Sequence, residues 1–519
     1  MTITPVAHAV NKDTSLFVGC VIAIATTSFG FISRAFLITE WGQRFNLSET
    51  QMGALQGAGL YPFALSIILF SLVIDRIGYG RALASAWVGH VASAIITMTA
   101  HGYGQLYLGT LVFALANGAV EAAANPMVAS LYPHSKTRHL NLLHAGWPGG
   151  LVLGGLLAIG LGSADWRWKI GLFLVPAMIY GAMMLGRHFP VQERVTAGIS
   201  YREMLGEFGW AGCLVVSFFG ARALDEIFRV FGTGLTLAAV ISLTLLPTIT
   251  YMVVIRRFGR PMFILLLLIM ILLATTELGT DSWVVSLMTP VLRHFSANAA
   301  NWMLIYTAAI MFVLRLYAGP IVHRLTPPGL LAGGSALAMT GLFGLSVAGG
   351  SAGIIFLMAT LYGVGKAFFW PTTLGLVSEQ FPKGGALTLN AVSGMGMIAV
   401  GVLGNPLLGT LQDHYLDRAL RQKSPALHAS VAEPPQTKYG VTFQPLDKQR
   451  IAQLPPEQHA IVEGVLQDSS QVTLAKIALL PAAMLVSYLG LMFYFRGRGG
   501  YKPFLLKPTD RQSLAVSLH

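Results

Sequence analysis

The stretch Asn117-Gly-Ala-Val-Glu121-Ala-Ala-Ala-Asn125-Pro126 lies inside the apolar run Leu106–Leu131 and gives the first indication of the architecture. A transmembrane helix needs about 20 predominantly apolar residues, so this run is long enough to cross a bilayer. An ionisable side chain at that depth is costly and by default marks a substrate or proton path. At four-residue spacing, Asn117, Glu121 and Asn125 share one helix face. The alternative is a polar contact between packed helices.

The composition indicates an all-α polytopic membrane protein. Of 519 residues, 54% are hydrophobic and only 11% are charged, whereas soluble domains carry about 25% charged residues. The formal net charge of +12 does not indicate nucleic-acid binding, because the basic residues cluster at the ends of apolar runs, as in oriented membrane helices. Cys20 and Cys213 both lie in apolar runs, so neither a disulfide framework nor a metal site is expected.

The apolar runs predict a two-half helix bundle with an extra helical hairpin, in total about 14 transmembrane helices. The predicted units are an N-terminal six-helix half (1–186), a cytoplasmic linker (187–209), the extra hairpin (210–260), a C-terminal six-helix half (261–498) containing an extracytoplasmic loop (412–471), and a cytoplasmic tail (499–519).

The chain repeats itself. Gly118-x2-Glu121-x4-Pro126 recurs as Gly363-x2-Lys366-x4-Pro371, 245 positions later, and Asn141 recurs as Asn390, 249 positions later. Two similar halves indicate a transporter-like architecture with the binding site between them near the membrane midplane. On this pattern we expect Glu121 and Lys366 to occupy matching positions.

The repeat also predicts the hairpin and the orientation. If Asp75-Arg76 and His323-Arg324 are equivalent, an even number of crossings separates them. The run Gly232–Ile255 is too apolar to stay outside the membrane, so 210–260 must cross twice. Arg256 and the other basic ends then lie inside, as the positive-inside rule expects, with both termini cytoplasmic in a cell membrane.

The turn Asp75-Arg76-Ile-Gly78-x-x-Arg81 resembles the charged motif that follows the second helix of the major facilitator superfamily. Glu121-Ala-Ala-x-Asn125-Pro126 and Asn141-Leu-Leu-His144 resemble its fucose–proton symporter branch more specifically. The resemblance implies alternating access, with the fourth-helix acid Glu121 taking part in proton-coupled sugar transport. It implies a gating role for Asp75, Arg76, Gly78 and Arg81 of the charged turn. The repeat adds Arg324, their counterpart in the second half.

Three acids are candidates for proton coupling. Glu121 is the main one, and Glu277 and Asp281 follow one helical turn apart in the run Met262–Met288. When two carboxyl groups lie this close together, ionisation of both is unfavourable, so the pair could share one proton. The alternative is that Asp281 lies near the outer surface and stays ionised.

Ten polar and aromatic side chains in or beside the apolar runs are candidates for substrate binding. They are Arg34, Asn117, Asn125, Asn141, His144, Trp147, Trp283, Arg315, Lys366 and Trp370. Aromatic rings beside carboxamides suit sugars, although any one ring could instead pack or belong to an interfacial belt. Arg315 and Lys366 could instead pair with Glu277 or Glu121, and Arg34 could snorkel to the interface.

We therefore predict a secondary transporter that imports a small polar solute, most simply a sugar, with protons. It would work as a monomer in the lipid bilayer, with no cofactor, no metal and no nucleic acid. One alternative is transport of an organic anion or a lipid, motivated by Arg34, Arg315 and Lys366. Another is a non-transporting membrane sensor that binds partners through 412–471. An enzyme is not expected, because the sequence contains no nucleophile–base or metal constellation.

Overall fold

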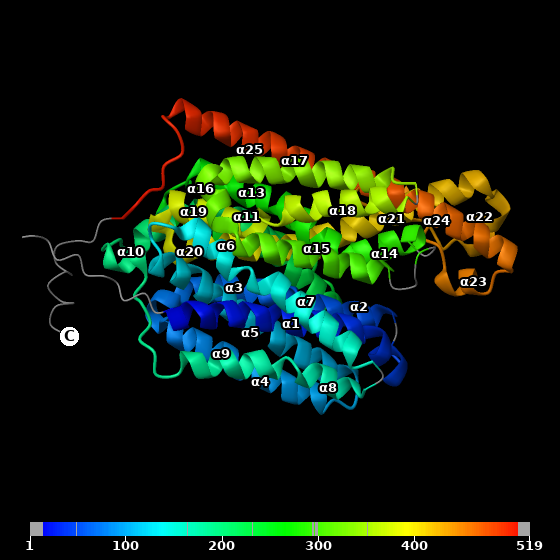
Figure 1. The fold of residues 1–519 in the computed structure, drawn as a ribbon, viewed down its shortest axis with the longest axis horizontal. Coiled ribbons are helices and arrows are strands. Elements are labelled where there is room, and N and C mark those ends of the chain that lie inside the picture. The colour runs from blue at the N-terminus through cyan, green and yellow to red at the C-terminus, as the bar shows by residue number, and fades with distance from the viewer. Residues whose placement is uncertain are drawn as a thin grey trace, which may run out of the picture.

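The computed structural model describes residues 14–47, 49–162, 164–230, 232–292, 295, 299–349 and 351–506. Helices form almost all of this part of the chain, which confirms the prediction of an all-α membrane protein (Figure 1). The start of the predicted N-terminal half, residues 1–13, and most of the predicted tail, residues 507–519, lie outside the described residues.

The N-terminal half is one bundle of long helices, several of them broken. Leu60 separates α2 from α3, whose first turn contains Pro62, and proline is tolerated there because its missing N–H has no partner in the helix. The elements are α1 (Thr14–Arg44), α2 (Glu49–Ala58), α3 (Tyr61–Ile77), α4 (Tyr79–Met98), α5 (Tyr103–Leu131), α6 (Lys136–Leu143), α7 (Gly146–Gly160), α8 (Trp166–Gly171) and α9 (Leu174–Met184).

Two long helices, which lie between the halves in the sequence, form the predicted hairpin. After the short α10 (Glu193–Thr196), the chain forms α11 (Tyr201–Val230) and α12 (Leu237–Ile255), which pack against each other. Helix α11 bends at Gly209, where φ is 69°, a value that favours glycine. Its helical segment after the bend begins with Trp210, whose backbone N–H donates to Arg257 O at 3.0 Å.

The C-terminal half is a second bundle, and it contains two π-helical turns. A π turn usually marks a local departure from regular packing and is frequent at functional sites. The elements are α13 (Pro261–Ala274), the π-helix η1 (Thr275–Gly279), α14 (Thr280–Leu292), α15 (Ala299–Leu316), α16 (Ala318–Arg324), α17 (Pro327–Ser346), α18 (Ala352–Lys366), α19 (Phe369–Gln380), the 3-10 turn η2 (Pro382–Gly384), α20 (Gly385–Ala399), the π-helix η3 (Val400–Gly404), α21 (Asn405–Lys423), α24 (Pro456–Ile477) and α25 (Leu479–Gly497).

The helices agree with the predicted number of membrane spans. Eleven described helical stretches are long and apolar enough to cross a membrane, and the α15–α16 pair, bent by 69°, makes a twelfth if it counts as one span. Helix α4 and the α8–α9 pair are not among these twelve, but they lie alongside them in the same bundle (Figure 1). With them, the bundle accommodates the fourteen helices expected for two six-helix halves and a hairpin.

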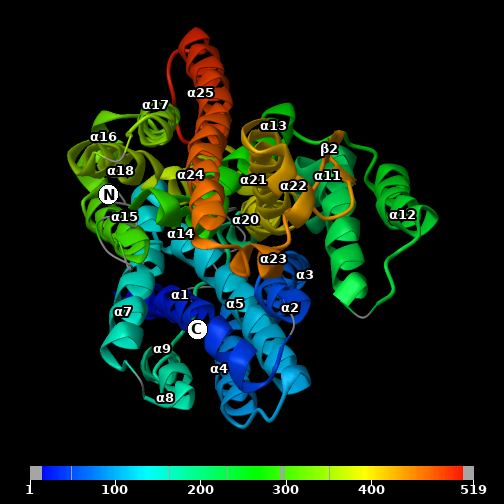
Figure 2. The same cartoon turned by 90° about the vertical axis from the view of Figure 1, so that its right-hand side faces the viewer.

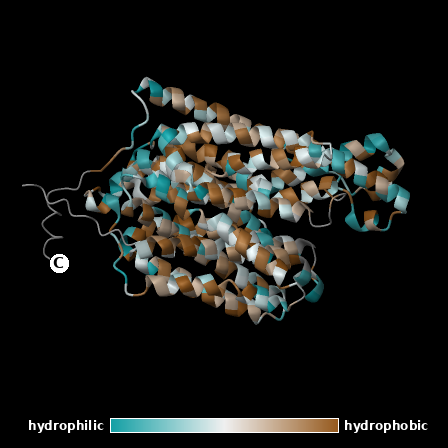
Figure 3. Ribbon diagram, in the orientation of Figure 1, coloured by the Kyte–Doolittle hydropathy of each residue, from teal (hydrophilic) through white to brown (hydrophobic). Residues whose placement is uncertain are grey.

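The predicted loop 412–471 is a folded cap rather than an extended loop. It contains the outer part of α21, α22 (Pro425–Val431), the antiparallel pair β1 (Gln436–Lys438) and β2 (Val441–Phe443), α23 (Lys448–Ala452) and the start of α24. Leu420, Leu427 and Val462 belong to a small core of its own. Figure 3 shows that the ribbon of this cap is coloured largely as hydrophilic residues, in contrast to that of the bundle.

Small residues let helices approach closely inside the halves. On α7, Gly146, Gly150 and Gly154 recur every four residues and face the backbone of α1, where an added side chain would collide. Close backbone approach through small residues is a common way for membrane helices to associate. These glycines therefore allow α7 to pack closely against α1.

Both described ends of the chain lie at the end of the bundle opposite the cap (Figure 1). Near the start of α1, the ring of Phe17 contacts Tyr132 at 5.5 Å between centroids, and near the last described residues Phe504 N donates to Glu379 O at 2.8 Å. We call this the basic end, because Lys136, Arg194, Arg260 and Lys383 lie there.

Candidate functional site

A small cavity lies between the two halves, and most of its lining was predicted from the sequence. Side chains nearly fill it in this arrangement: the free space is about 20 Å³, room for about one water molecule. Helices α5, α7, α15, α19 and α20, the turn after α6, and the π-helix η1 contribute to it. The lining residues are Glu121, His144, Trp147, Glu277, Leu278, Arg315, Trp370 and Met397.

Glu121 is buried on the N-terminal side of this cavity and is held by neutral groups. Its side chain is 3% exposed. Asn125 Nδ2 donates to Glu121 Oε2 at 3.2 Å, and Ser393 Oγ of α20 donates to the same oxygen at 2.7 Å. None of the ion pairs among the described residues includes Glu121. Since Ser393 belongs to the other half, the carboxyl group links the two halves directly.

His144 extends this network of hydrogen bonds. Its Nε2 lies 2.9 Å from Asn125 Oδ1. His144 is therefore hydrogen-bonded within the bundle and also lines the cavity. Together Ser393, Glu121, Asn125 and His144 form one chain of polar groups across the interface.

Glu277, on the C-terminal side, has a cationic partner. It lies in the π-helix η1, and Arg315 Nη2 donates to its Oε1 at 2.9 Å, with both side chains almost fully buried. Arg315 also donates to Ala367 O at 2.6 Å and to His144 O of the other half at 2.9 Å. The planar guanidinium thus joins η1, the break between α18 and α19, and the N-terminal half.

Asp281 does not share a proton-binding site with Glu277 in this arrangement, because each acid has its own cation. Lys366 Nζ pairs with Asp281 Oδ1, and the ammonium group lies 4.7 Å from the ring centroid of Tyr362. Neither Lys366 nor Asp281 lines the cavity. Arg315 and Lys366 therefore pair with acids, as the alternative interpretation expected. The partner of Lys366, however, is Asp281 and not Glu277 or Glu121.

Two polar atoms at the cavity have no partner among the described residues. They are Trp370 Nε1, a donor, and Glu277 Oε2, an acceptor. Buried polar atoms are normally hydrogen-bonded, so such exceptions are informative. The Trp147 ring lies 6.1 Å from Phe31, and Trp370 reaches the cavity from the other half. The cavity therefore offers two indole rings, one free donor and one free acceptor.

Other predicted residues lie away from the cavity. Asn117 Oδ1 is 2.8 Å from His90 Nε2 inside the N-terminal half. Arg34 does not snorkel: it is buried, donates to Ser93 Oγ at 2.7 Å, and lies 3.9 Å from the Phe113 ring centroid. Trp283 packs against Gly409 of α21. Sequence reasoning missed Ser393, Leu278 and Met397, which carry no charge and belong to no motif.

Two asparagines that reach the opposite half indicate a register for the repeat that differs from the predicted one. Asn141 Nδ2 donates to Thr372 Oγ1 at 3.2 Å, and Asn390 Nδ2 donates to Ala122 O at 3.0 Å. Asn141 and Asn390 are 249 positions apart, and Ala122 and Thr372 are 250 apart. On this register the counterpart of Glu121 falls at Trp370 or Pro371, one helical turn beyond Lys366.

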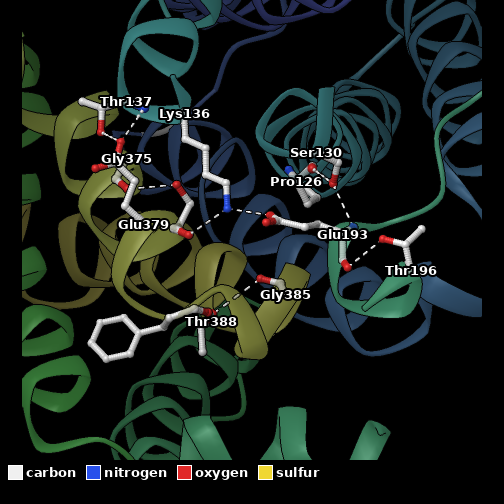
Figure 4. Close-up of polar contacts among 12 residues, drawn as sticks. Pro126, Ser130, Lys136, Thr137, Glu193, Thr196, Gly375, Glu379, Gly385 and Thr388 are labelled. Atoms are coloured by element: carbon white, nitrogen blue, oxygen red, sulfur yellow. Dashed lines mark hydrogen bonds and ion pairs between the residues drawn. The ribbon is translucent and has the colours of Figure 1, made fainter. Parts of the chain in front are cut away.

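A cluster of polar contacts closes the basic end between the halves, and we call it the interhalf clamp (Figure 4). Lys136 Nζ donates to Glu193 Oε2 at 2.5 Å and to Ser378 O at 3.3 Å. The backbone N–H and the hydroxyl of Thr137 both donate to Glu379 Oε1, at 3.1 and 2.5 Å. The clamp thus joins α6 to α19 through side chains of both halves and of the linker.

The segment that follows α25 also contacts this clamp. Tyr501 donates its hydroxyl to Glu379 Oε2 at 2.6 Å. Burial and the nearby carboxylate raise the pKa of Tyr501, so the phenol stays protonated and remains a donor. Glu379 therefore receives donors from the N-terminal half and from the C-terminal segment at once.

The charged turn after α3 is tied to the linker. Asp75 pairs with Arg194 of α10, and the Arg76 guanidinium lies 5.6 Å from the ring centroid of Tyr201. Gly78 has φ of 81°, a conformation that explains why glycine occupies this turn. Arg81 and Arg324 are exposed at the same end. Among these contacts, the partner Arg194 was not predicted.

The described residues contain no group of three or more His, Cys, Asp or Glu side chains that could hold a metal ion.

Comparisons with known proteins agree with this architecture. The family model described as Major Facilitator Superfamily matches residues 16–279. No curated protein sequence matches the chain. The solved structures named here are distant in sequence, at 12–14% identity, so they bear on the fold alone.

Three of these structures span nearly the whole chain. The proton:xylose symporter XylE bound to 6-bromo-6-deoxy-D-glucose has a TM-score of 0.58 and 14% identity, covering 93% of this chain and 95% of its own. The E. coli fucose:proton symporter FucP has a TM-score of 0.52 and 14% identity, covering 89% and 98%. The human organic anion transporter MFSD10 has a TM-score of 0.57 and 12% identity, covering 92% and 98%.

Proposed function

Because the chain belongs to the Major Facilitator Superfamily, we propose that this secondary transporter imports a neutral sugar, or a similar small polar solute, together with protons. Alternating access of the two halves around the cavity would move the solute. Glu121 would carry the proton, and Trp147, Trp370 and the free atoms at the cavity would bind the solute. No cofactor takes part.

The observation that carries the proposal is the position of Glu121, a buried carboxyl group with only neutral partners between the two halves. Such a group can gain or lose a proton without breaking an ion pair. The Ser393 hydroxyl can donate to the carboxylate or accept from the protonated acid. Protonation of Glu121 would therefore change the contact between the halves, which is what coupling requires.

The chemistry of the cavity supports a neutral polar solute. The Arg315 charge is balanced by Glu277, so an anionic solute would have to compete with a buried carboxylate. A sugar offers C–H faces for the indole rings of Trp147 and Trp370. Its hydroxyl groups could accept from Trp370 Nε1 and donate to Glu277 Oε2, the two atoms without partners. Two of the similar structures are named as proton symporters of xylose and fucose.

An organic anion is the second candidate, and one observation favours it. Arg315 lines the cavity and is itself almost fully buried, and MFSD10, of similar fold, is named as an organic anion transporter. If Glu277 became protonated, the guanidinium would be available to an anionic solute. Lipid transport, or a sensor function acting through the cap, has no comparable support from the cavity.

The proposed placement is a cell membrane with the basic end in the cytoplasm. Lys136, Arg194, Arg260 and Lys383 lie at that end, as the positive-inside rule expects. Both described chain ends lie there as well. The two-half design needs no second copy, so we propose a monomer.

The test is proton movement in liposomes containing the purified protein, on addition of neutral sugars and sugar acids. External alkalinisation with one neutral sugar, lost in Glu121→Gln, would support the proposal and name the solute class. Alkalinisation with sugar acids alone would favour the anion candidate. Alkalinisation by a neutral sugar that persists unchanged in Glu121→Gln would refute the role of Glu121.

A further inference from the structure

A second, apolar groove lies between the extra hairpin and the main bundle. Its free volume is about 480 Å³, and it opens to the outside of the bundle. Ile68 of α3 and Leu387 of α20 form its inner wall, and Val216 of α11 and Val254 of α12 form its outer wall. Figure 2 shows α12 at the outer edge of the molecule, with α11 between it and the main bundle.

The groove has little to offer a polar ligand. Of the hydroxyl groups that line it, that of Tyr251 donates to Leu205 O at 2.8 Å, and that of Ser217 lies 3.6 Å from Cys213 Sγ. Thr250 is exposed on the outer helix. Because water cannot satisfy its hydrogen bonds against such walls, a groove of this kind inside a bilayer is filled by hydrocarbon.

One end of the groove carries positive charge. Val254 and Ile255 line it, and Arg256 and Arg257 follow them directly in the chain. Arg202 Nη2 reaches Val254 O at 3.3 Å from α11. We call Arg202, Arg256, Arg257 and Lys383 the basic rim.

The basic rim has an excess of cations over acids. Glu207 is already paired with Arg260 at 3.0 Å, and Glu203 lies within electrostatic reach of both Arg257 and Lys383. Arg202, Arg256 and Arg257 are exposed. Each guanidinium has five N–H donors, of which Arg202 uses one on Val254 O and Arg256 uses one on Val253 O. Basic pockets between membrane helices on the cytoplasmic side are a known way of holding anionic lipid head groups.

We propose that this groove holds an acyl chain of an anionic phospholipid, whose phosphate binds the basic rim. The apolar walls take the hydrocarbon, and the cations at its end select the head group. The lipid would fill the space between α12 and the bundle and so fix the hairpin against α3 and α20. This site is separate from the cavity that contains Glu121.

Binding to the purified protein tests the proposal, with dioleoyl phosphatidylglycerol and dioleoyl phosphatidylcholine as probes. We expect native mass spectrometry to detect one tightly held phosphatidylglycerol, and thermal unfolding to shift upward with phosphatidylglycerol more than with phosphatidylcholine. Arg256→Gln combined with Arg257→Gln should weaken phosphatidylglycerol binding about tenfold or more. The matched control is Arg498→Gln, which removes an exposed charge outside the groove.

A neighbouring pair of substitutions on α11 tests the groove itself. Ser217→Trp fills it, whereas Phe218→Trp alters the next residue, which is 46% exposed and does not line it. We expect only Ser217→Trp to displace the lipid. Equal binding of both lipids, or normal phosphatidylglycerol binding in the rim and Ser217→Trp variants, would overturn the proposal.

A third measurement uses the unaltered protein and therefore does not depend on variants that fold. A phosphatidylglycerol with a photoreactive group on its acyl chain should crosslink to peptides of α11 and α12. Crosslinks confined to helices that do not line the groove, that is, to helices other than α3, α11, α12 and α20, would contradict the proposal.

Discussion

Two glutamates face the same cavity from opposite halves, and their surroundings differ. Glu121 of α5 accepts hydrogen bonds from Asn125 and Ser393, both of them neutral. Glu277 of η1 is paired with the Arg315 guanidinium at 2.9 Å. Both carboxyl groups are almost fully buried, at 3% and 2% exposure. The difference between them is therefore the charge of the partner rather than the degree of burial.

This difference separates a group that can change its charge from one that is fixed in place. Removing one member of a buried ion pair leaves the other charge uncompensated, which is strongly unfavourable. Glu277 and Arg315 thus act as a unit that also holds Ala367 O and His144 O. Glu121 has no such constraint. We therefore propose that the three acids predicted to couple protons have different roles, with Glu121 serving coupling and Glu277 and Asp281 serving structure.

The largest expected effect follows from substituting the acid with neutral partners. Glu121→Gln keeps the size of the side chain and can still accept from Ser393, so we expect a folded protein with an unchanged unfolding temperature. Proton coupling should be lost entirely, because an amide cannot carry the proton. The measurement is solute-driven proton movement in liposomes beside solute exchange without a proton gradient. Retained exchange with lost coupling would sharpen the distinction, and retained coupling would break it.

At the ion pair of Glu277 and Arg315, by contrast, we expect a substitution to lower the stability of the protein. Arg315→Gln leaves the Glu277 carboxylate buried and unpaired, which should cost about 3–5 kcal/mol of stability. The measurement is thermal unfolding of the purified protein. The double variant with Glu277→Gln removes both charges and should recover most of that loss. If Arg315→Gln alone is as stable as the parent protein, Glu277 is not held by this pair.

Sequence and structure agree best where the membrane imposes strict rules. The apolar runs located the helices and the hairpin, because a spanning segment must be long and apolar. Charged or aromatic residues inside those runs, such as Glu121, Glu277 and Trp370, were recognisable because burial there is costly. Six of the eight lining residues of the cavity were therefore named in advance.

The remaining residues depended on three-dimensional approach. Ser393 reaches Glu121 only because α20 crosses α5, and a serine in an apolar run gives no signal of that. The match of Glu121 with Lys366 followed a recurring Gly and Pro spacing, but the contacts of Asn141 and Asn390 place the correspondence one turn later. In the cap, polar helices such as α22 and α23 lack the long apolar runs that marked the bundle.

The second ion pair of the C-terminal half offers a graded version of the same test. Lys366 is fully buried, but the Asp281 side chain is 15% exposed, so water can partly compensate for the loss of the ammonium group. We expect Lys366→Met to cost about 1–3 kcal/mol, less than Arg315→Gln. Lys366→Met with Asp281→Leu should recover stability, since an apolar pair can replace a buried ion pair. A cost above that of Arg315→Gln would contradict the ranking by exposure.

The smallest effect is expected at the interhalf clamp, where the acid is more exposed. Lys136 is buried, but the Glu193 side chain is 19% exposed, so its loss of a partner should cost only about 1 kcal/mol. Lys136 also donates to Ser378 O of α19, so its loss removes a contact between the halves and its cost falls on the arrangement closed at the basic end. Lys136→Gln should therefore shift the population about fivefold towards an arrangement open at that end.

Spin labels at His134→Cys and Gln380→Cys, with Cys20 and Cys213 replaced by serine, would report the shift as a longer distance. Arg498→Gln, which removes an exposed charge at the end of α25, serves as the control. An equal shift in both variants would mean that net charge at the basic end, rather than the Lys136–Glu193 contact, sets the balance between the two arrangements.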